Sequence, residues 1–292
     1  MSGGVFVVDK PSGCTSHTVV AQARRRLGTR AVGHAGTLDP MATGVLLLLV
    51  DEGTKLSPYL SLETKAYRAE ILFGRATDTL DTDGKLLREA PVPPGALGES
   101  PLQEALAGEL ARTEQVPPAV SAIQIGGQRA HALARRGEAV DLPPRVVRVE
   151  SLELRAVQGE RIELEVRASK GYYVRALARD LGERLGLPAC LSALRRTESG
   201  AFTLGEAWPW PLPADAEPLS LVAAVKRCLP CVELTAEGER KAALGQGLAR
   251  EHFVDAPGHA GTHAWLHDGK LVAVGAARDD SFRVVRGFGR RG

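Results

Sequence analysis

The order of apolar and polar positions predicts short strands and helices along most of the chain. Residues 4–10 form an apolar run that ends at Lys-Pro and Ser-Gly, which is typical of a strand followed by a turn. Residues 16–28 carry apolar side chains at helical spacing, with Ser16 as a candidate N-cap and Gly28 at the end. Residues 45–50 are all apolar and predict a strand buried on both faces.

The same patterns continue beyond this strand. They predict a strand at 65–74, an amphipathic helix at 102–115, a hairpin at 145–169 that turns near Gln158-Gly159, and a helix at 171–186. Strands separated by helices at uneven spacing favour an α+β fold with a mixed, largely antiparallel sheet.

The pattern changes near residue 230 to short apolar runs separated by Gly-rich turns. Asp268-Gly269 lies between two alternating runs and is a strong hairpin signal. About sixty residues of this kind suit a small C-terminal β-barrel. We therefore expect one domain over residues 1–229 and a second over 230–292.

Composition changes this picture little. The chain has 292 residues, with 44% hydrophobic and 25% charged residues, as expected of a soluble globular protein of about two domains. It has no apolar stretch of membrane-spanning length and no signal-peptide pattern, so we expect no membrane association. Four cysteines are too few for a disulfide framework, which favours the cytoplasm.

The arginines are grouped, although the net charge is only +2. Their fork-shaped side chains suit phosphate oxygens, but scattered solvated arginines would give the same pattern. The groups are Arg24, Arg25, Arg26 and Arg30; Arg129, Arg135, Arg136, Arg145 and Arg148; Arg195 and Arg196; and the arginines of residues 283–292.

Three familiar motifs fail on inspection. "GFGRRG" at 287–292 ends the chain, so no helix follows to receive a pyrophosphate. "TLDTDG" at 79–84 lacks the ligand positions of a calcium loop. Cys228 and Cys231 form one C-x-x-C without a second ligand pair at zinc-site spacing. We expect no metal site.

The segment "GHAGTLDPMATG" at 33–44 carries one carboxylate, Asp39, before a proline. Its glycines and alanines would let another molecule approach the backbone closely, and a buried strand anchors it. From the residues alone, a structural turn aspartate is the better interpretation.

Five segments together change that interpretation. The chain closely resembles the bacterial tRNA pseudouridine-55 synthases, the TruB family, whose motifs it carries in the family order. The segments are "DKPSGCTSH" at 9–17, "GHAGTLDPMATGVL" at 33–46, "KAYRAEILFGRATDTLDTDG" at 65–84, "SKGYYVRALARDLG" at 169–182 and "LRRTESGAF" at 194–202. The resemblance implies a pseudouridine-synthase catalytic domain followed by a PUA-like domain.

The resemblance also implies a mechanism. Asp39 is the expected nucleophile, acting at ribose C1′ or at uracil C6 of a flipped-out uridine, and Arg175 is its expected charge partner. Uracil is detached, turned and rejoined through carbon 5, which requires no cofactor and no metal.

The remaining site residues are assigned from the resemblance as well. Tyr67, Tyr173 and Leu194 would line the uracil pocket, with Tyr172 pointing elsewhere. His34 would occupy or brace the space of the extruded nucleotide, and Lys10 and Pro11 would support the pocket. The expected partner is the T-arm of tRNA, bound by a monomer that requires no protein partner.

Three positions depart from the family pattern: Val120, Gln124 and His131. They fall in a segment expected to support the active site and RNA contact. Two rivals stay open: an RNA-binding or tRNA-folding factor that has lost catalysis, and a guide-RNA-dependent modifier of ribosomal RNA. A folding role alongside catalysis is also compatible with the sequence.

Overall fold

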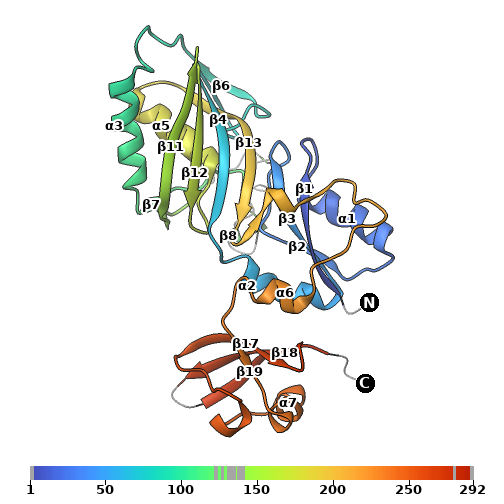
Figure 1. Ribbon diagram of the computed structural model, residues 1–292. Coiled ribbons are helices and arrows are strands. Elements are labelled where there is room, and N and C mark those ends of the chain that lie inside the picture. The colour runs from blue at the N-terminus through green and yellow to red at the C-terminus, as the bar shows by residue number, and fades with distance from the viewer. Residues whose placement is uncertain are drawn as a thin grey trace. The chain divides into compact units, whose positions relative to one another are not determined.

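The computed structural model describes residues 3–121, 124–125, 128–129, 136, 142–278 and 281–289. The chain divides into two compact units. The first unit comprises residues 1–40, 44–63 and 199–292, and the second comprises 41–43 and 64–198. Figure 1 shows the helices and strands of both units.

The first unit is built on two buried strands. β1 (Gly4–Lys10) pairs antiparallel with β3 (Thr43–Val50) over its whole length, so the predicted strands at both places are confirmed. β2 (Val32–Ala35) adds to β3, and β15 (Trp208–Pro209) pairs parallel with β1. The sequence pattern did not predict β2, because "VGHA" is too short and too rich in small residues to signal a strand.

The N-cap of helix α1 (Ser16–Leu27) lies one residue before the expected Ser16. Thr15 is the N-cap, and its Oγ1 accepts a hydrogen bond from the Thr18 N–H at 3.0 Å. The predicted cap, Ser16, is buried and bonds elsewhere. Gly28 ends the helix in the left-handed conformation at φ 65°, as predicted.

Short elements complete this part of the first unit. They are η1 (Asp51–Leu56), α2 (Ser57–Leu60), β14 (Phe202–Thr203), η2 (Leu204–Glu206) and α6 (Leu221–Val225).

The second unit holds four long strands in the order β11, β12, β4 and β13. β11 (Val149–Gln158) and β12 (Arg161–Ala168) form the predicted hairpin, with Gly159 at φ 61° in its turn. β12 pairs antiparallel with β4 (Lys65–Phe73). The sequence did not signal β13 (Ala189–Ser199), because arginines interrupt its apolar pattern.

Two helices accompany these strands. α3 (Glu99–Leu110) and α5 (Val174–Leu185) pack against each other, α3 contacts β11 and α5 contacts β4 (Figure 1). α3 ends five residues before the predicted 115, because the chain then turns and Gln115 joins a two-residue strand. The short strand pairs are β5 (Arg75–Thr77) with β6 (Leu86–Glu89), β7 (Glu114–Gln115) with β10 (Arg145–Val146), and β8 (Gln124–Ile125) with β9 (Gln128–Arg129).

The C-terminal part of the first unit carries its own four-stranded sheet, which confirms the predicted β-rich region. The strands, in order, are β16 (Cys231–Glu233), β17 (Gly261–His267), β18 (Lys270–Arg278) and β19 (Ser281–Gly287). Asp268 and Gly269, both at positive φ, form the predicted hairpin turn.

Two expectations for this region need correction. Over the described residues the sheet is open, not a closed barrel: β16 is three residues long, and Leu248 meets Phe282 of β19 in a single bridge. Within the region predicted to hold short strands, residues 236–243 instead form helix α7 (Ala236–Ala243), which Thr235 caps. The 3-10 turn η3 (Arg250–His252) follows it.

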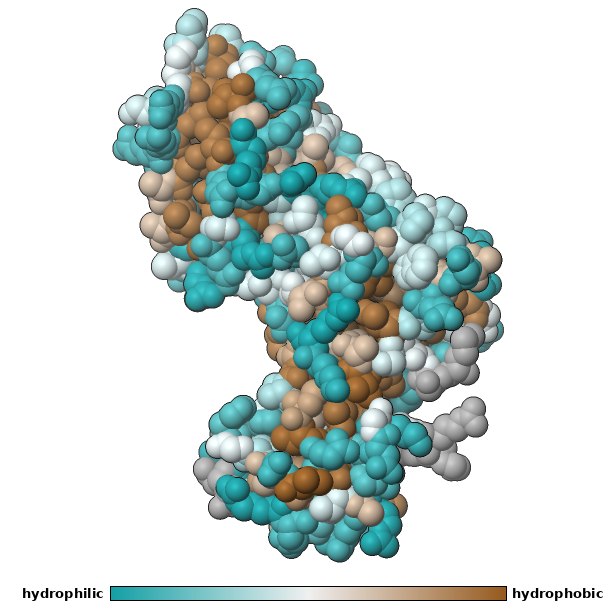
Figure 2. All heavy atoms as spheres, in the orientation of Figure 1, coloured by the Kyte–Doolittle hydropathy of each residue, from teal (hydrophilic) through white to brown (hydrophobic). Residues whose placement is uncertain are grey.

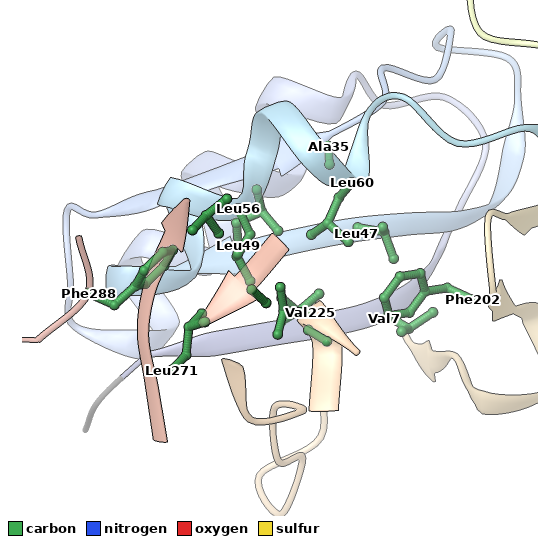
Figure 3. Close-up of a cluster of buried hydrophobic side chains, with 14 of the residues drawn as sticks. Val7, Ala35, Leu47, Leu49, Leu56, Leu60, Phe202, Val225, Leu271 and Phe288 are labelled. Atoms are coloured by element: carbon green, nitrogen blue, oxygen red, sulfur yellow. The ribbon is translucent and has the colours of Figure 1, made fainter. Parts of the chain in front are cut away.

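One apolar cluster joins this sheet to the rest of the first unit (Figure 3). Leu47 and Leu49 of β3 belong to this cluster. Leu271 of β18, Phe288 and Val225 of α6 belong to it as well. Figure 2 shows apolar side chains where the C-terminal strands meet α2 and α6. Burial of this cluster stabilises the packing of the C-terminal sheet against β3 and α6 within the first unit.

Candidate active site

The loop that carries Asp39 is fastened by a buried lysine. Lys10, at the end of β1, is 0% exposed, and its Nζ donates to the carbonyl oxygens of Pro11 at 2.8 Å, Cys14 at 2.7 Å and Pro40 at 3.3 Å. The Gly13 N–H also donates to the Pro40 oxygen, at 3.0 Å. A buried ammonium needs such partners, and these three connect the 11–14 loop to the residue after Asp39.

The residue before Asp39 is held from helix α1. The Ser16 Oγ accepts a hydrogen bond from the Leu38 N–H at 2.9 Å and donates to the Leu38 carbonyl at 3.1 Å. Both neighbours of Asp39 are therefore fixed to rigid elements, while Asp39 itself is half-buried. Such a loop preorganises a reactive carboxylate.

His34 lies on β2, opposite Leu48 of β3. Its ring meets the ring of His17 edge to face, with centroids 5.5 Å apart. His17 ends the "DKPSGCTSH" segment but received no role from the sequence, since an exposed histidine on a helix gives no signal of its partner. The pair places one imidazole on α1 and one on β2, the strand that leads into the Asp39 loop.

In the second unit, Arg175 is 5% exposed and lies in the first turn of α5. Its Nη1 donates to the Thr79 carbonyl at 2.7 Å, its Nη2 donates to the Val120 carbonyl at 3.0 Å, and its Nε lies 3.7 Å from the Asp81 carboxylate. These bonds fix the direction of the guanidinium. Its pairing with Asp39 stays a prediction.

Asp81 belongs to the "TLDTDG" segment that we rejected as a calcium loop. The carboxylate accepts from Thr79 Oγ1 at 2.5 Å and from the Asp83 N–H at 3.2 Å, and it is 6% exposed. The segment therefore shapes the surroundings of Arg175, a role that spacing alone does not reveal.

Gln115 holds the turn that precedes α5. It is 1% exposed, its Oε1 accepts from the Tyr173 N–H at 2.8 Å, and its Nε2 donates to the Tyr173 carbonyl at 3.2 Å. Both main-chain groups of Tyr173 are satisfied by one side chain. The sequence missed this residue because the pattern placed it at the end of a helix.

A buried polar network supports the same turn from α3. The Tyr172 hydroxyl donates to Glu109 at 2.9 Å, so Tyr172 points toward α3, as expected. Arg112 binds Glu109 at 2.7 Å and Asp180 of α5 at 3.2 Å. Burial raises the pKa of the Glu109 carboxyl despite these donors, and burial beside Glu109 raises the pKa of Tyr172 well above its usual value.

Tyr67 and Leu194 also belong to the second unit. Tyr67 is half-buried on β4, opposite Val166 of β12. Leu194 is buried on β13, and its carbonyl accepts a bond from Thr43 Oγ1 at 3.4 Å. The structure thus places Lys10, Pro11, His34 and Asp39 in the first unit and Tyr67, Tyr173, Arg175 and Leu194 in the second.

The structure describes the three positions that depart from the family pattern to different extents. Val120 supplies its carbonyl to Arg175, a contact that any side chain at this position allows. Gln124 lies in β8, for which only the backbone is described, and His131 lies outside the described residues.

Cys228 and Cys231, the C-x-x-C pair, pack as apolar core side chains. Burial raises the pKa of the Cys228 thiol to about 12 and also raises that of Cys231, and both side chains pack against the shared apolar cluster. No group of three His, Cys, Asp or Glu side chains suited to a metal occurs among the described residues. Within the same residues, no helix has the length and apolar character needed to cross a membrane.

Comparison with known proteins assigns the class. The chain is similar over 99% of its length to a chain of a Cbf5-Nop10-Gar1 complex, with a TM-score of 0.77, 25% identity and 85% of that chain covered. A chain of an H/ACA RNP bound to a substrate RNA shares the fold, with a TM-score of 0.73. The family model and the named relatives given below make the protein an RNA pseudouridine synthase, an isomerase.

Sequence relatives narrow the assignment. The family model described as "TruB family pseudouridylate synthase (N terminal domain)" matches residues 24–174, so the chain belongs to the TruB family. A tRNA pseudouridine synthase B from Nocardia farcinica is 51% identical, covering 75% of this chain and 72% of its own length. One from Arthrobacter sp. is 40% identical, covering 94% of this chain and 92% of its own. The predicted family is confirmed.

Proposed function

We propose that the protein isomerises uridine 55 in the T-loop of tRNA to pseudouridine, with Asp39 as nucleophile. The observation that carries this proposal is the fastening of the Asp39 loop at both of its neighbours by Lys10 and Ser16. These bonds fix the backbone on both sides of Asp39, as the preorganisation of a reactive carboxylate requires. The tRNA substrate is supported by the names of the curated relatives.

The proposed chemistry uses side chains alone. In the C1′ route, the Asp39 carboxylate bonds to ribose C1′ of the flipped uridine while the C1′–N1 bond breaks and uracil leaves as its anion, with Arg175 as the charge partner of Asp39. The turned uracil then bonds to C1′ through carbon 5 while the ester bond to Asp39 breaks. Tyr67 stacks on the uracil and passes the carbon-5 proton toward N1, so the product is an isomer of the substrate. Tyr173 and Leu194 line the pocket, and His34 takes the space that the nucleotide leaves.

The C-terminal sheet is proposed as a PUA-like domain over residues 230–292 that contacts the tRNA beyond the T-arm. The exposed arginines supply phosphate contacts that weaken with salt. We propose that the protein works as a monomer, without a protein partner, in the cytoplasm where tRNA is modified.

The test is Asp39→Asn, which preserves shape and removes the nucleophilic charge. We expect loss of pseudouridine formation by at least about 10³-fold with tRNA affinity within about threefold of wild type. Asp268→Asn, at the exposed hairpin turn, is the matched control and should keep full activity. Full activity of Asp39→Asn would exclude the mechanism.

The two rivals predict other outcomes in this assay. A folding factor without catalysis would bind tRNA tightly and form no pseudouridine with the wild-type protein. A guide-dependent enzyme would leave tRNA unmodified until a guide RNA is added. A folding role alongside catalysis would persist in Asp39→Asn.

A further inference from the structure

A cleft of about 500 Å³ opens beside the loop that Lys10 holds. Its walls are the 11–14 loop, Gln22 and Arg26 of α1, and Trp210 with Pro211. Of these residues only Pro11 was assigned a role above. The volume falls within the range of small-ligand pockets and suits one nucleotide.

Trp210 gives the cleft an oriented aromatic wall. Its indole Nε1 donates to the Gln22 Oε1 at 2.9 Å, which ties the ring to α1. The ring is half-buried, so part of it is accessible. Planar bases stack on such rings whatever their sequence.

Arg26 gives the cleft a positive charge. It is exposed in the last turn of α1, next to Arg25, and no acidic side chain lines the cleft. Arg24, by contrast, donates to the Val32 carbonyl at 2.9 Å and is engaged within the protein. An exposed guanidinium beside an aromatic ring is complementary to a phosphate and its base.

The cleft is also joined to the candidate active site. Cys14 and Pro11 supply carbonyls to Lys10, and Gly13 donates to Pro40, the residue after Asp39. A nucleotide in the cleft would therefore contact the same loop that supports the nucleophile.

We propose that this cleft binds a second nucleotide of the substrate RNA, one that is not isomerised, with its base on Trp210 and its phosphate at Arg26. The inference rests on the proposed function, because that function supplies RNA as the ligand. The cleft contributes affinity and holds the RNA in register without taking part in the chemistry.

The experiment measures tRNA binding and single-turnover pseudouridine formation for Trp210→Ala, Trp210→Phe and Arg26→Ala. We expect tRNA binding to weaken about tenfold in Trp210→Ala and to stay near wild type in Trp210→Phe, which keeps a stacking ring. Arg26→Ala should weaken tRNA binding and reduce the slope of log affinity against log salt concentration by about one, as expected for the loss of one phosphate contact. Saturating tRNA should restore the single-turnover rate in each.

Two further measurements distinguish a shared nucleotide from general surface charge. The loss of tRNA-binding free energy in the double variant Arg26→Ala/Trp210→Ala should be smaller than the sum of the losses in the two single variants. In the double variant Arg25→Ala/Trp210→Ala, the two losses should add. Bound tRNA should slow alkylation of Cys14, which lines the cleft, as measured by peptide mass spectrometry.

The outcomes separate this proposal from the proposed function. If the wild type modifies tRNA while Trp210→Ala and Arg26→Ala bind tRNA normally and Cys14 stays unprotected, the cleft proposal is overturned and the function stands. If the wild type binds tRNA through the cleft but forms no pseudouridine, the function fails and the cleft proposal is supported.

Discussion

At the scale of single residues, the candidate site depends on buried polar side chains, of which the resemblance assigned Lys10 to pocket support and gave no role to Gln115. Lys10 is fully buried against three carbonyls, and Gln115 satisfies both main-chain groups of Tyr173. The motif resemblance could assign Asp39 and Arg175 a role, because their segments match. It could not find Gln115 or Asp81, because their importance comes from contacts distant in sequence.

The need for glycine at position 275 also comes from a contact distant in sequence, with Trp265. A Cβ at this position would lie 1.9 Å from the Trp265 ring. We expect Gly275→Ala to lower the free energy of unfolding by about 3 kcal/mol, since a buried indole cannot move aside freely. Chemical denaturation measures this free energy. Gly258→Ala is the control, because no atom lies within 4 Å of a Cβ added at Gly258. Equal stability of the two variants would contradict this packing.

At the scale of elements, periodicity predicted β1, β3, the 145–169 hairpin and the Asp268-Gly269 turn, because each has a strong local signal. It failed for β13 and α7. β13 carries arginines along a strand, and α7 depends on the Thr235 cap more than on apolar spacing. Tertiary contacts decide such segments, and one sequence does not display them.

The turn before α5 is the element on which the second group of site residues depends. Replacement of Gln115 by Met keeps the volume but removes the side-chain bonds to the N–H and carbonyl of the half-buried Tyr173, whose carbonyl keeps its bond from the Leu177 N–H. We expect pseudouridine formation to fall at least tenfold in kcat with little change in KM, together with a stability loss of about 2 kcal/mol. Gln103→Met, exposed on α3, is the control. An unchanged kcat would show that this clamp does not position the site.

At the scale of the whole molecule, the predicted β-rich C-terminal region is confirmed. The boundary between residues 229 and 230 stays a prediction. Within the first unit, the C-terminal sheet shares an apolar cluster with β3, and Gly289 donates to Glu52 at 3.2 Å. A sequence pattern marks where strands change character, but it cannot show which apolar faces pack together.

This shared cluster predicts coupled stability. Leu271→Ala should leave a cavity and cost about 3 kcal/mol. We expect faster amide hydrogen exchange at Leu47 and Leu49 of β3, not only in the C-terminal sheet. Leu244 is 76% exposed in the same region, so Leu244→Ala should leave the stability and the amide exchange of β3 unchanged. Exchange confined to residues 230–292 would contradict coupling through the cluster.

The central claim concerns one uridine. The most direct measurement is single-nucleotide mapping of pseudouridine after the purified protein acts on a full-length, unmodified tRNA transcript without added RNA or protein. The account predicts one pseudouridine, at position 55 of the T-loop. A transcript without pseudouridine, or with pseudouridine only in another arm, would contradict it.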